Sequence, residues 1–295
     1  MNSNSYVSIL LAVFNGEKFI QKAITSVLDQ NYQHWELIIV DNGSNDKTNE
    51  ICHEFCKIDK RVFFYSLETR GKNNAFNYAY SKSKGNYICF FAADDMLTID
   101  SLEKRTNKLA FSKSYSTCQL KTLSENPKFD NLIFPKKSTV PNYSGGSILF
   151  TRDLAELIFP LPISLPNEDT WASLHLRTFG QNTHVPKSLY LYRIHNNNSY
   201  GYDLKFKEKR KRFIQRMLAY NLFEEKWDNE NINFLKNHIK PFIEGLDLMK
   251  SNRRFEILFV KKLHISDKFK LILYSSKFIY NFRQILFRLF SGIIN

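Results

Sequence analysis

The chain has 295 residues, of which 43% are apolar and 15% aromatic, so it can build a core and is not a disordered or low-complexity chain. Its formal net charge of +13 favours anionic partners such as nucleic acid, anionic lipid or acidic substrates. No run approaches the roughly 18 uncharged apolar residues of a membrane-spanning helix. No basic segment followed by an apolar run opens the chain, so we expect neither a membrane span nor a signal peptide.

The positive charge is concentrated in the last third of the chain. Residues 205–295 contain 20 Lys and Arg against 9 Asp and Glu, whereas residues 1–204 contain 22 against 20. We therefore predict a near-neutral domain at 1–204 and a basic, mainly helical region at 205–295.

The first part of the chain alternates between strand patterns and helix patterns. Continuous apolar, β-branched runs predict buried strands, and apolar residues at three- or four-residue steps predict helices. The predicted strands cover 6–14, 36–40, 61–67 and 87–92, and the predicted helices cover 17–30, 45–56, 73–83 and 170–179. This alternation indicates right-handed βαβ units and a mostly parallel sheet, which binds ligands at the carboxyl ends of its strands.

The common nucleotide-binding fingerprints are absent. The turn after the first strand reads Phe14-Asn15-Gly16-Glu17, without G-x-G-x-x-G, and no G-x-x-x-x-G-K-[ST] occurs. This argues against a nicotinamide-dependent dehydrogenase and a P-loop ATPase. A nucleotide bound here would need another counter-charge, such as a metal ion held by carboxylates.

The four cysteines indicate neither a disulfide framework nor a zinc site. Cys52 and Cys56 fit one helix face, but no second pair or nearby His completes a zinc set. We expect ordinary thiols in a reducing compartment.

Two adjacent carboxylates, Asp94 and Asp95, follow the predicted strand at 87–92. Because like charges repel, the pair suits a divalent cation that bridges it to a diphosphate, and Mg²⁺ and Mn²⁺ prefer such oxygen ligands. The alternative is an acidic turn, or an N-cap for a helix that begins near Thr98.

Three further positions have a functional and a structural interpretation. Asp41, at the end of the second strand, can accept hydrogen bonds from a base or ribose, or can order its own turn. The pair Glu168-Asp169 can supply a general base, or can suit the dipole of a first helical turn. His195 can complete a metal shell as a neutral imidazole, or can be structural.

Four separated stretches together resemble glycosyltransferase family 2, whose members are inverting enzymes with the GT-A fold. The stretches are 7–48, 70–97, 145–154 and 168–180, and they agree with the family in order, spacing and length. The resemblance implies an α/β domain with a Rossmann-like, nucleotide-binding, mostly parallel sheet flanked by helices. Residues 205–295 carry no family motif that we recognise.

Carried over by position, the resemblance implies roles for single residues. The nucleotide-sugar site would comprise Ala12, Phe14, Asn15, Glu17, Asp41 and Asp94. The metal, Mn²⁺ or Mg²⁺, would be bound by Asp95 and His195. Gly146 and Glu168 would lie in the acceptor and sugar pocket, and Asp169 would be the catalytic base.

The sequence departs from the family pattern at the metal motif. Relatives often read Asp-Ala-Asp-Asp where this chain has Ala92-Ala93-Asp94-Asp95, so the first acid is missing. Phe14 replaces the usual Tyr, and Asn42 replaces the second Asp after the second strand. The missing acid supports an alternative, a catalytically inactive relative that binds a sugar nucleotide or a glycan.

The resemblance implies transfer of a hexosyl or N-acetylhexosaminyl group, with inversion, from a nucleotide sugar to a glycan or lipid-linked saccharide. UDP is the preferred nucleotide, and the role would be synthesis of a surface polysaccharide such as O-antigen, capsule or lipooligosaccharide. Nucleic acid is not an expected partner. The basic region has charge and aromatic residues, but it matches no nucleic-acid module, and acids at the strand ends repel phosphate unless a metal is bound.

The residues at 261–294 combine basic side chains with one apolar helical stripe. The stripe consists of Leu271, Tyr274, Phe278, Phe282, Ile285 and Leu289. The predicted amphipathic helix either lies on an anionic membrane surface or docks its stripe on the protein and leaves its basic face solvated. The resemblance favours the membrane, and so a cytoplasmic protein bound peripherally to the inner face of the cell membrane.

Overall fold

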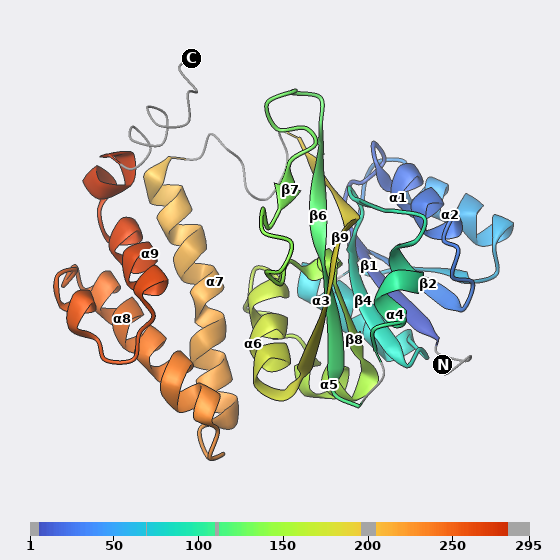
Figure 1. The fold of residues 1–295 in the computed structure, drawn as a ribbon. Coiled ribbons are helices and arrows are strands. Elements are labelled where there is room, and N and C mark those ends of the chain that lie inside the picture. Colours follow the sequence, from blue (N-terminus) through green and yellow to red (C-terminus); the bar gives the residue numbers. More distant parts are fainter. Residues whose placement is uncertain (1–5, 69, 110–111, 196–204, 283–295) are drawn as a thin grey trace. The chain divides into compact units, whose positions relative to one another are not determined.

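The computed structural model describes residues 6–68, 70–109, 112–195 and 205–282. The chain divides into two compact units, residues 1–199 and 200–295, which are treated separately below (Figure 1). The predicted domain boundary at 204/205 borders residues 196–204, which lie outside the described part, and it stays a prediction.

The first half of unit 1 contains seven elements. They are β1 (Val7–Val13), α1 (Ile20–Leu28), β2 (Trp35–Asp41), α2 (Thr48–Ile58), β3 (Val62–Ser66), α3 (Lys72–Lys82) and β4 (Tyr87–Ala92). The predicted strands and helices are all present here. The first helix begins at Ile20 instead of 17, because the amides of Phe19 and Ile20 both turn back to the carbonyl of Gly16. The four strands are parallel, in the order β3-β2-β1-β4.

The second half adds strands of both directions. Its elements are β5 (Met96–Leu97), α4 (Ser101–Thr106), β6 (Ser114–Ser124), β7 (Ile133–Phe134), the 3₁₀ turn η1 (Gly145–Ser147), β8 (Ile148–Thr151), α5 (Arg152–Ile158), α6 (Asp169–Phe179) and β9 (Gln181–Ile194). β8 is antiparallel to β4 and β6, and β6 is parallel to β9. The sheet order is β3-β2-β1-β4-β8-β6-β9-β5, with β7 paired to β6. The predicted α/β fold with a helix-flanked sheet is confirmed, although its antiparallel strands were not predicted.

Each face of the sheet carries its own core. Ile9 and Leu11 of β1 belong to a cluster that includes Ile24 of α1 and Cys52 of α2, two helices that lie together in Figure 1. Side chains of the other parity meet the opposite layer, where Phe90 contacts aromatic rings of α3, β8 and the end of α5. This alternation follows from the two-residue period of a strand, and it explains why the runs are apolar throughout.

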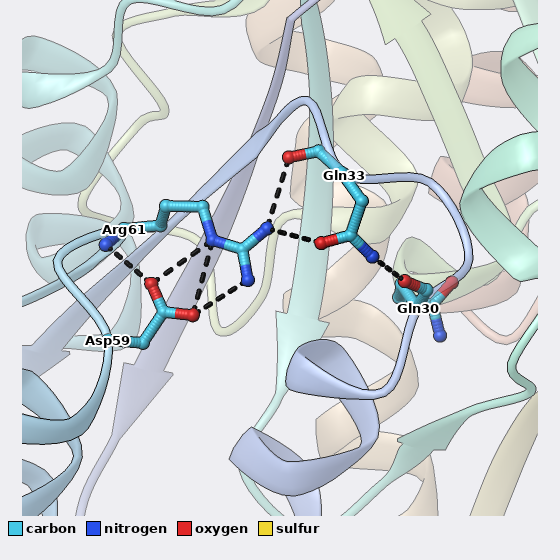
Figure 2. A network of polar contacts seen from close by, with 4 residues as sticks. All are labelled: Gln30, Gln33, Asp59 and Arg61. Atoms are coloured by element: carbon cyan, nitrogen blue, oxygen red, sulfur yellow. Dashed lines mark hydrogen bonds and ion pairs between the residues drawn. The ribbon is translucent and has the colours of Figure 1, made fainter.

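A polar network joins the amino ends of β2 and β3 (Figure 2). The Arg61 guanidinium donates to both oxygens of Asp59 at 2.7–3.2 Å and to the backbone and side-chain oxygens of Gln33 at 3.1 and 3.0 Å. It also lies 3.7 Å from the ring centroid of Trp35. Gln33 in turn donates to the carbonyl of Gln30 at 2.6 Å. The network ties α1 to two strand starts, at the edge of the sheet away from the strands' carboxyl ends.

Unit 2 is helical over the residues that the structure describes. Its elements are α7 (Phe206–Trp227), the π-helical turn η2 (Leu235–Ile239), α8 (Lys240–Lys250), the 3₁₀ turn η3 (Glu256–Phe259) and α9 (Ile265–Ser275). Phe213 of α7 stacks on Tyr274 of α9 with ring centroids 4.2 Å apart, and Tyr220 stacks on Phe242 of α8 at 4.1 Å. None of the helices among the described residues is long and apolar enough to cross a membrane.

The prediction of one continuous amphipathic helix over 261–294 is wrong. The chain is extended at Ser276 (φ −143°, ψ 126°), which ends α9 and breaks the stripe. Leu271 is buried beside Gly245, and Tyr274 stacks inside the unit, so this part of the stripe fills the core of unit 2. Phe278 and Phe282 are exposed, and Ile285 and Leu289 lie outside the described residues.

We expect Arg61→Ala to lower the free energy of unfolding by about 2 kcal/mol, because it removes the charge-assisted bonds to Asp59 and the guanidinium donor to Gln33. The Arg61 hydrogen bond lowers the pKa of Asp59 from its ordinary 3.8, so this contribution is present above that value and is lost as the pH falls through the lowered pKa. Urea unfolding at neutral pH and below 3.8 measures both effects.

Lys57→Ala is the matched control, since its ion pair with Glu54 is solvent-exposed. This variant should change stability by no more than about 0.5 kcal/mol. Equal stability of the two variants would contradict a structural role for the Arg61 network.

Candidate functional site

The carboxyl ends of β1, β2 and β4 lie in register. Ala12 pairs with Val40 and with Ala92, and Val13 pairs with Asp41. The segments that follow these strands therefore start at the same edge of the sheet, where open α/β sheets bind ligands. Ala12 itself is partly buried.

Asn15 joins the loop after β1 to the loop after β2. Its amide donates to the Ser44 hydroxyl at 2.8 Å, and its side-chain oxygen accepts from the amide of Asn45 at 3.0 Å. Its φ of 49° is left-handed, a conformation that Asn tolerates better than most residues. Asn15 thus holds the two loops together, in addition to the ligand role expected from the resemblance.

Glu17 makes a second reciprocal link between the same loops. Its amide donates to Asp46 at 3.1 Å, and its carboxylate accepts from the amide of Lys47 at 3.1 Å. Burial opposes ionisation of Asp46, but hydrogen bonds from Thr48 and from the Glu17 amide lower its pKa. The loop is therefore fixed by an ionised carboxylate at neutral pH.

Asp41 is fully buried and orders the turn that follows β2. One carboxylate oxygen accepts from the amides of Gly43 and Ser44 at 3.2 and 3.0 Å and from Asn49 at 3.3 Å, and the other accepts from the Ser44 hydroxyl. The turn interpretation thus has a direct structural basis. The role in binding a base or ribose stays a prediction.

Phe14 and Arg70 form an exposed aromatic and cationic pair beside these loops. Phe14 is 48% exposed, and the Arg70 guanidinium lies 5.2 Å from its ring centroid. Arg70 precedes Gly71, whose amide donates to the side chain of Asn42 at 2.9 Å. No role for Arg70 was predicted, although this residue opens one of the stretches that resemble the family.

The adjacent Asp94 and Asp95 have different environments. Asp95 is 3% exposed, and its two oxygens accept from the Tyr190 hydroxyl at 2.5 Å and from the amide of Arg193 at 2.7 Å. The Asp94 side chain is 32% exposed, and one of its oxygens lies 3.0 Å from Nε2 of His195. His195 therefore contacts Asp94 and not Asp95.

Burial explains why Asp95 acts as an internal acceptor. Burial, and next the charge of Asp94, raise the pKa of Asp95 well above its ordinary value, while burial and Asp95 itself raise the pKa of Tyr190. Tyr190 leaves no space for a larger residue at Gly146, where a Cβ would lie 2.0 Å from the Cζ of its ring. Gly146 thus allows the contact that holds Asp95 inward.

Arg193 and Phe19 support the Asp94 side of the site. The Arg193 Nε donates to the backbone oxygen of Asp94 at 2.8 Å, and its guanidinium lies 4.9 Å from the Phe19 ring centroid. The ring centroid of His195 is also 4.9 Å from that of Phe19. The order Tyr-Arg-Ile-His places Arg193 and His195 on one side of a strand, which the two-residue period alone would have indicated.

Glu168 and Asp169 lie at the start of α6, against η1. The amide of Gly145 donates to Oδ1 of Asp169 at 2.7 Å. A Cβ at Gly145 would lie 2.7 Å from that oxygen and 3.0 Å from Oε1 of Glu168, so a glycine is needed for this close approach. The side-chain Nδ2 of Asn167 donates to the other Asp169 oxygen at 3.4 Å.

Lys72, at the start of α3, is a further residue of this site that the sequence did not indicate. Its ammonium lies 3.0 and 2.9 Å from the two oxygens of Glu168, which is buried, while the Lys72 side chain is 42% exposed. Burial alone would lower the pKa of Lys72, but Glu168, then Asp169 and Asp94, raise it above its ordinary value. The charges of Glu168 and Asp169 in one segment, and of Asp94 in another, therefore all raise the pKa of Lys72.

Among the residues that the structure describes, no group of three or more His, Cys, Asp and Glu side chains is arranged to hold a metal ion. Asp94 and His195 supply two donors. Mg²⁺ and Mn²⁺ commonly take one or two carboxylates and complete their shell with phosphate and water oxygens, so two protein donors fit such a site.

A known family matches half of the chain. The model for glycosyl transferase family 2 matches residues 8–158, which run from β1 to the last residue of α5. The chain belongs to glycosyl transferase family 2. This match confirms the family that the four stretches predicted. The matched residues include the ends of β1, β2 and β4 described above.

Several curated glycosyltransferases are similar to part of the chain. An uncharacterized glycosyltransferase of Haemophilus influenzae is 35% identical over 138 residues, which are 43% of this chain and 55% of that protein. A putative teichuronic acid biosynthesis glycosyltransferase, TuaG of Bacillus subtilis, is 38% identical over 105 residues, or 35% of this chain and 42% of TuaG. The chain spans about half, or less, of the length of these curated relatives.

Solved structures show the same fold at low sequence identity. Residues 1–349 of TarS from S. aureus, in complex with UDP-GlcNAc, align with a TM-score of 0.62 at 15% identity, over 97% of this chain and 92% of that one. The mannosyltransferase PcManGT from Pyrobaculum calidifontis, in complex with GDP-Man and Mn²⁺, aligns with a TM-score of 0.59 at 15% identity, over 76% and 65%. At this identity the likeness shows the fold alone.

We expect Lys72→Met to destabilise the chain by about 2 kcal/mol, because it leaves the buried carboxylate of Glu168 without its cation. Adding Glu168→Gln to Lys72→Met should restore most of the loss, since the remaining side chain carries no charge. Urea unfolding of the two single variants and the double variant measures the coupling.

Lys72→Arg keeps the charge and serves as the control, with stability close to that of the unaltered chain. Simple additivity of Lys72→Met and Glu168→Gln would show that the ion pair contributes nothing to stability.

Proposed function

We propose that this chain is an inverting glycosyltransferase that transfers a sugar from a nucleotide-sugar donor to a saccharide acceptor. The observation that carries the proposal is the ion pair of Lys72 with Glu168, the neighbour of Asp169, at a position where the charges of Asp169 and Asp94 both raise the pKa of Lys72. Asp94 follows β4 and Asp169 begins α6, so a group for the donor diphosphate and a general base belong to one site. Family membership supplies the reaction class.

The donor we propose is a UDP-sugar. TarS binds UDP-GlcNAc and PcManGT binds GDP-Man, which supports a nucleotide sugar and leaves its base to be tested. The exposed Phe14 ring, with Arg70 beside it, offers a stacking surface for a base. Asp41 and the loops held by Asn15 and Glu17 would line the rest of the nucleoside site.

We assign the metal-binding role to Asp94 and His195. The sequence interpretation paired Asp95 with His195, but Asp95 is buried and both of its oxygens accept hydrogen bonds, whereas Asp94 is partly exposed and adjoins His195. Mn²⁺ or Mg²⁺ bound there would neutralise the charge that develops on the departing diphosphate. PcManGT, which holds Mn²⁺, supports this choice of metal.

Asp169 is the proposed general base. The Gly145 amide holds its Oδ1, which orients the carboxylate, and Lys72 keeps positive charge nearby. Asp169 takes the proton of the acceptor hydroxyl while that oxygen forms a bond to the anomeric carbon. The bond from this carbon to the diphosphate oxygen breaks on the opposite face, so the configuration inverts. Holding both partners in line supplies much of the acceleration.

The acceptor we propose is a glycan or lipid-linked saccharide of a surface polysaccharide, presented at the inner face of the cell membrane. TuaG, a relative, is described as a putative teichuronic acid biosynthesis enzyme, which supports a cell-surface polymer. The proposal includes a peripheral position of this chain at that membrane.

One observation favours a second function. Ala92 occupies the strand end where relatives often have an acid, and Asp95 is turned into the protein. A chain with these features could bind a sugar nucleotide or glycan without turnover. Metal-dependent hydrolysis of the donor separates the two functions, because only the transferase produces free nucleotide.

We expect the chain to bind UDP in the presence of Mn²⁺ and to lose most of this affinity in EDTA. Asp94→Asn should weaken binding with Mn²⁺ by about tenfold or more, because it removes an anionic ligand of the cation. Asp95→Asn should change binding by less than about threefold, since Asn can still accept from the Arg193 amide. Calorimetric titration with UDP, GDP and dTDP measures these affinities.

If Asp95→Asn lost the Mn²⁺ dependence of UDP binding and Asp94→Asn kept it, the metal ligand would be Asp95 and not Asp94. Absence of binding to all three nucleotides by folded protein would remove the donor proposal.

We expect Asp169→Asn to reduce turnover by about two to four orders of magnitude and to leave donor affinity nearly unchanged, because it removes the base and keeps the geometry. The measurement is nucleotide release from the donor that calorimetry identifies, with and without acceptor. Ser173→Ala, on the same helix, is the control and should retain activity. Near-normal turnover in Asp169→Asn would exclude Asp169 as the base.

A further inference from the structure

Five large apolar side chains of unit 2 are exposed on two neighbouring elements, η3 and the start of α9. They are Phe255, Leu258, Phe259, Ile265 and Phe269, with exposed fractions between 46% and 81%. We call this set the η3–α9 surface. Single exposed apolar residues are normal on proteins, but several on two elements that contact each other are typical of an interaction site.

The η3–α9 surface belongs to a packed structure and not to a loose segment. Ile257, Val260 and Leu263 alternate with the exposed residues and are buried in the core of unit 2. The Lys268 ammonium donates to the carbonyl of Leu258 at 2.6 Å, which fastens α9 to η3. The exposed side chains are therefore presented outward by the fold.

The two exposed residues of α9 lie on one face of that helix. Ile265 and Phe269 are four residues apart, so they are neighbours along the helix surface. The buried Leu271 turns the other side of α9 toward α8. The first part of the apolar stripe expected from the sequence, Leu271 and Tyr274, thus packs inside the unit, and a different set of α9 side chains faces outward.

Basic residues are interspersed with these apolar residues along the sequence. Residues 253–270 carry six basic side chains, Arg253, Arg254, Lys261, Lys262, Lys268 and Lys270, against only Glu256 and Asp267. Glu256 is paired with Arg253 at 2.5 Å, so it does not neutralise the lysines. A partner must accept phenyl rings and carry negative charge, which are the two properties of an anionic bilayer surface.

We propose that the η3–α9 surface docks this chain on an anionic phospholipid membrane. The phenyl rings of Phe255, Phe259 and Phe269 enter the boundary between headgroups and acyl chains, and Lys261 and Lys262 contact lipid phosphates. This deepens the membrane position included in the proposed function by assigning it to named residues. It rests on that position and not on the sugar-transfer chemistry, so the two are tested separately.

The test is sedimentation of the full chain with phosphatidylcholine vesicles that contain or lack phosphatidylglycerol. The unaltered chain should bind the anionic vesicles, and binding should weaken as salt rises. Phe255→Ser/Phe259→Ser/Phe269→Ser should reduce partitioning by at least about tenfold. Lys261→Gln/Lys262→Gln should reduce it by about fivefold for each charge removed.

The matched control is Ile58→Ser/Ile163→Ser, which removes two apolar side chains of unit 1 that are 70% and 73% exposed. This variant should bind vesicles like the unaltered chain. The triple Phe variant should keep its thermal unfolding transition, because the exchanged side chains are exposed.

Two results would overturn the inference. One is equal vesicle binding, or equal absence of binding, by the unaltered chain and the triple Phe variant. The other is a dimer in size-exclusion chromatography with light scattering that the triple Phe variant abolishes, which would assign the surface to a second copy of the chain. Vesicle binding without nucleotide binding would leave this inference intact and refute the proposed donor.

Discussion

Carboxylates that gather at the edge of a sheet repel one another, and the architecture around them depends on how that repulsion is offset. Here the ammonium of Lys72 forms an ion pair with the buried Glu168 and responds to Asp169 and Asp94 as well. The ion pair thereby joins the beginning of α3 to the beginning of α6, and the charge of Asp94, in the turn after β4, further raises the pKa of Lys72. Gly145 completes the arrangement, because its amide reaches Asp169 and the missing side chain leaves room for both acids of α6.

The same edge shows how packing can give two identical, adjacent residues different chemistry. Asp95 is directed inward by the Tyr190 hydroxyl and the Arg193 amide, and Tyr190 fits only because Gly146 has no side chain. Asp94, one residue earlier, keeps part of its surface in water and faces His195. Burial raises the pKa of the Asp95 carboxyl, whereas Asp94 keeps part of its carboxylate accessible to a ligand. The environment, and not the residue type, separates an internal acceptor from a candidate metal ligand.

Local patterns predicted much of this structure. We could recognise the apolar runs of β1, β2 and β4 and the apolar spacing of α1 and α3. The periods of strands and helices depend only on residues close together in the sequence. The antiparallel β8 and the long pairing of β6 with β9 were not predicted, since register between distant segments leaves no short-range signal. Lys72 was missed for the same reason, because its partner Glu168 is 96 residues away. The break at Ser276 was missed because apolar spacing continues across it, and only tertiary packing decides where α9 ends.

The reciprocal hydrogen bonds of Asn15 and Glu17 have a thermodynamic consequence. These bonds, together with the four that converge on Asp41, fix the loops after β1 and β2 to each other within the chain itself. A molecule that binds against them does not have to order them first, so less of its contact energy is lost to conformational entropy. Such a ligand would bind to preorganised loops. Its association rate constant should therefore be set by diffusion and orientation and not by loop closure.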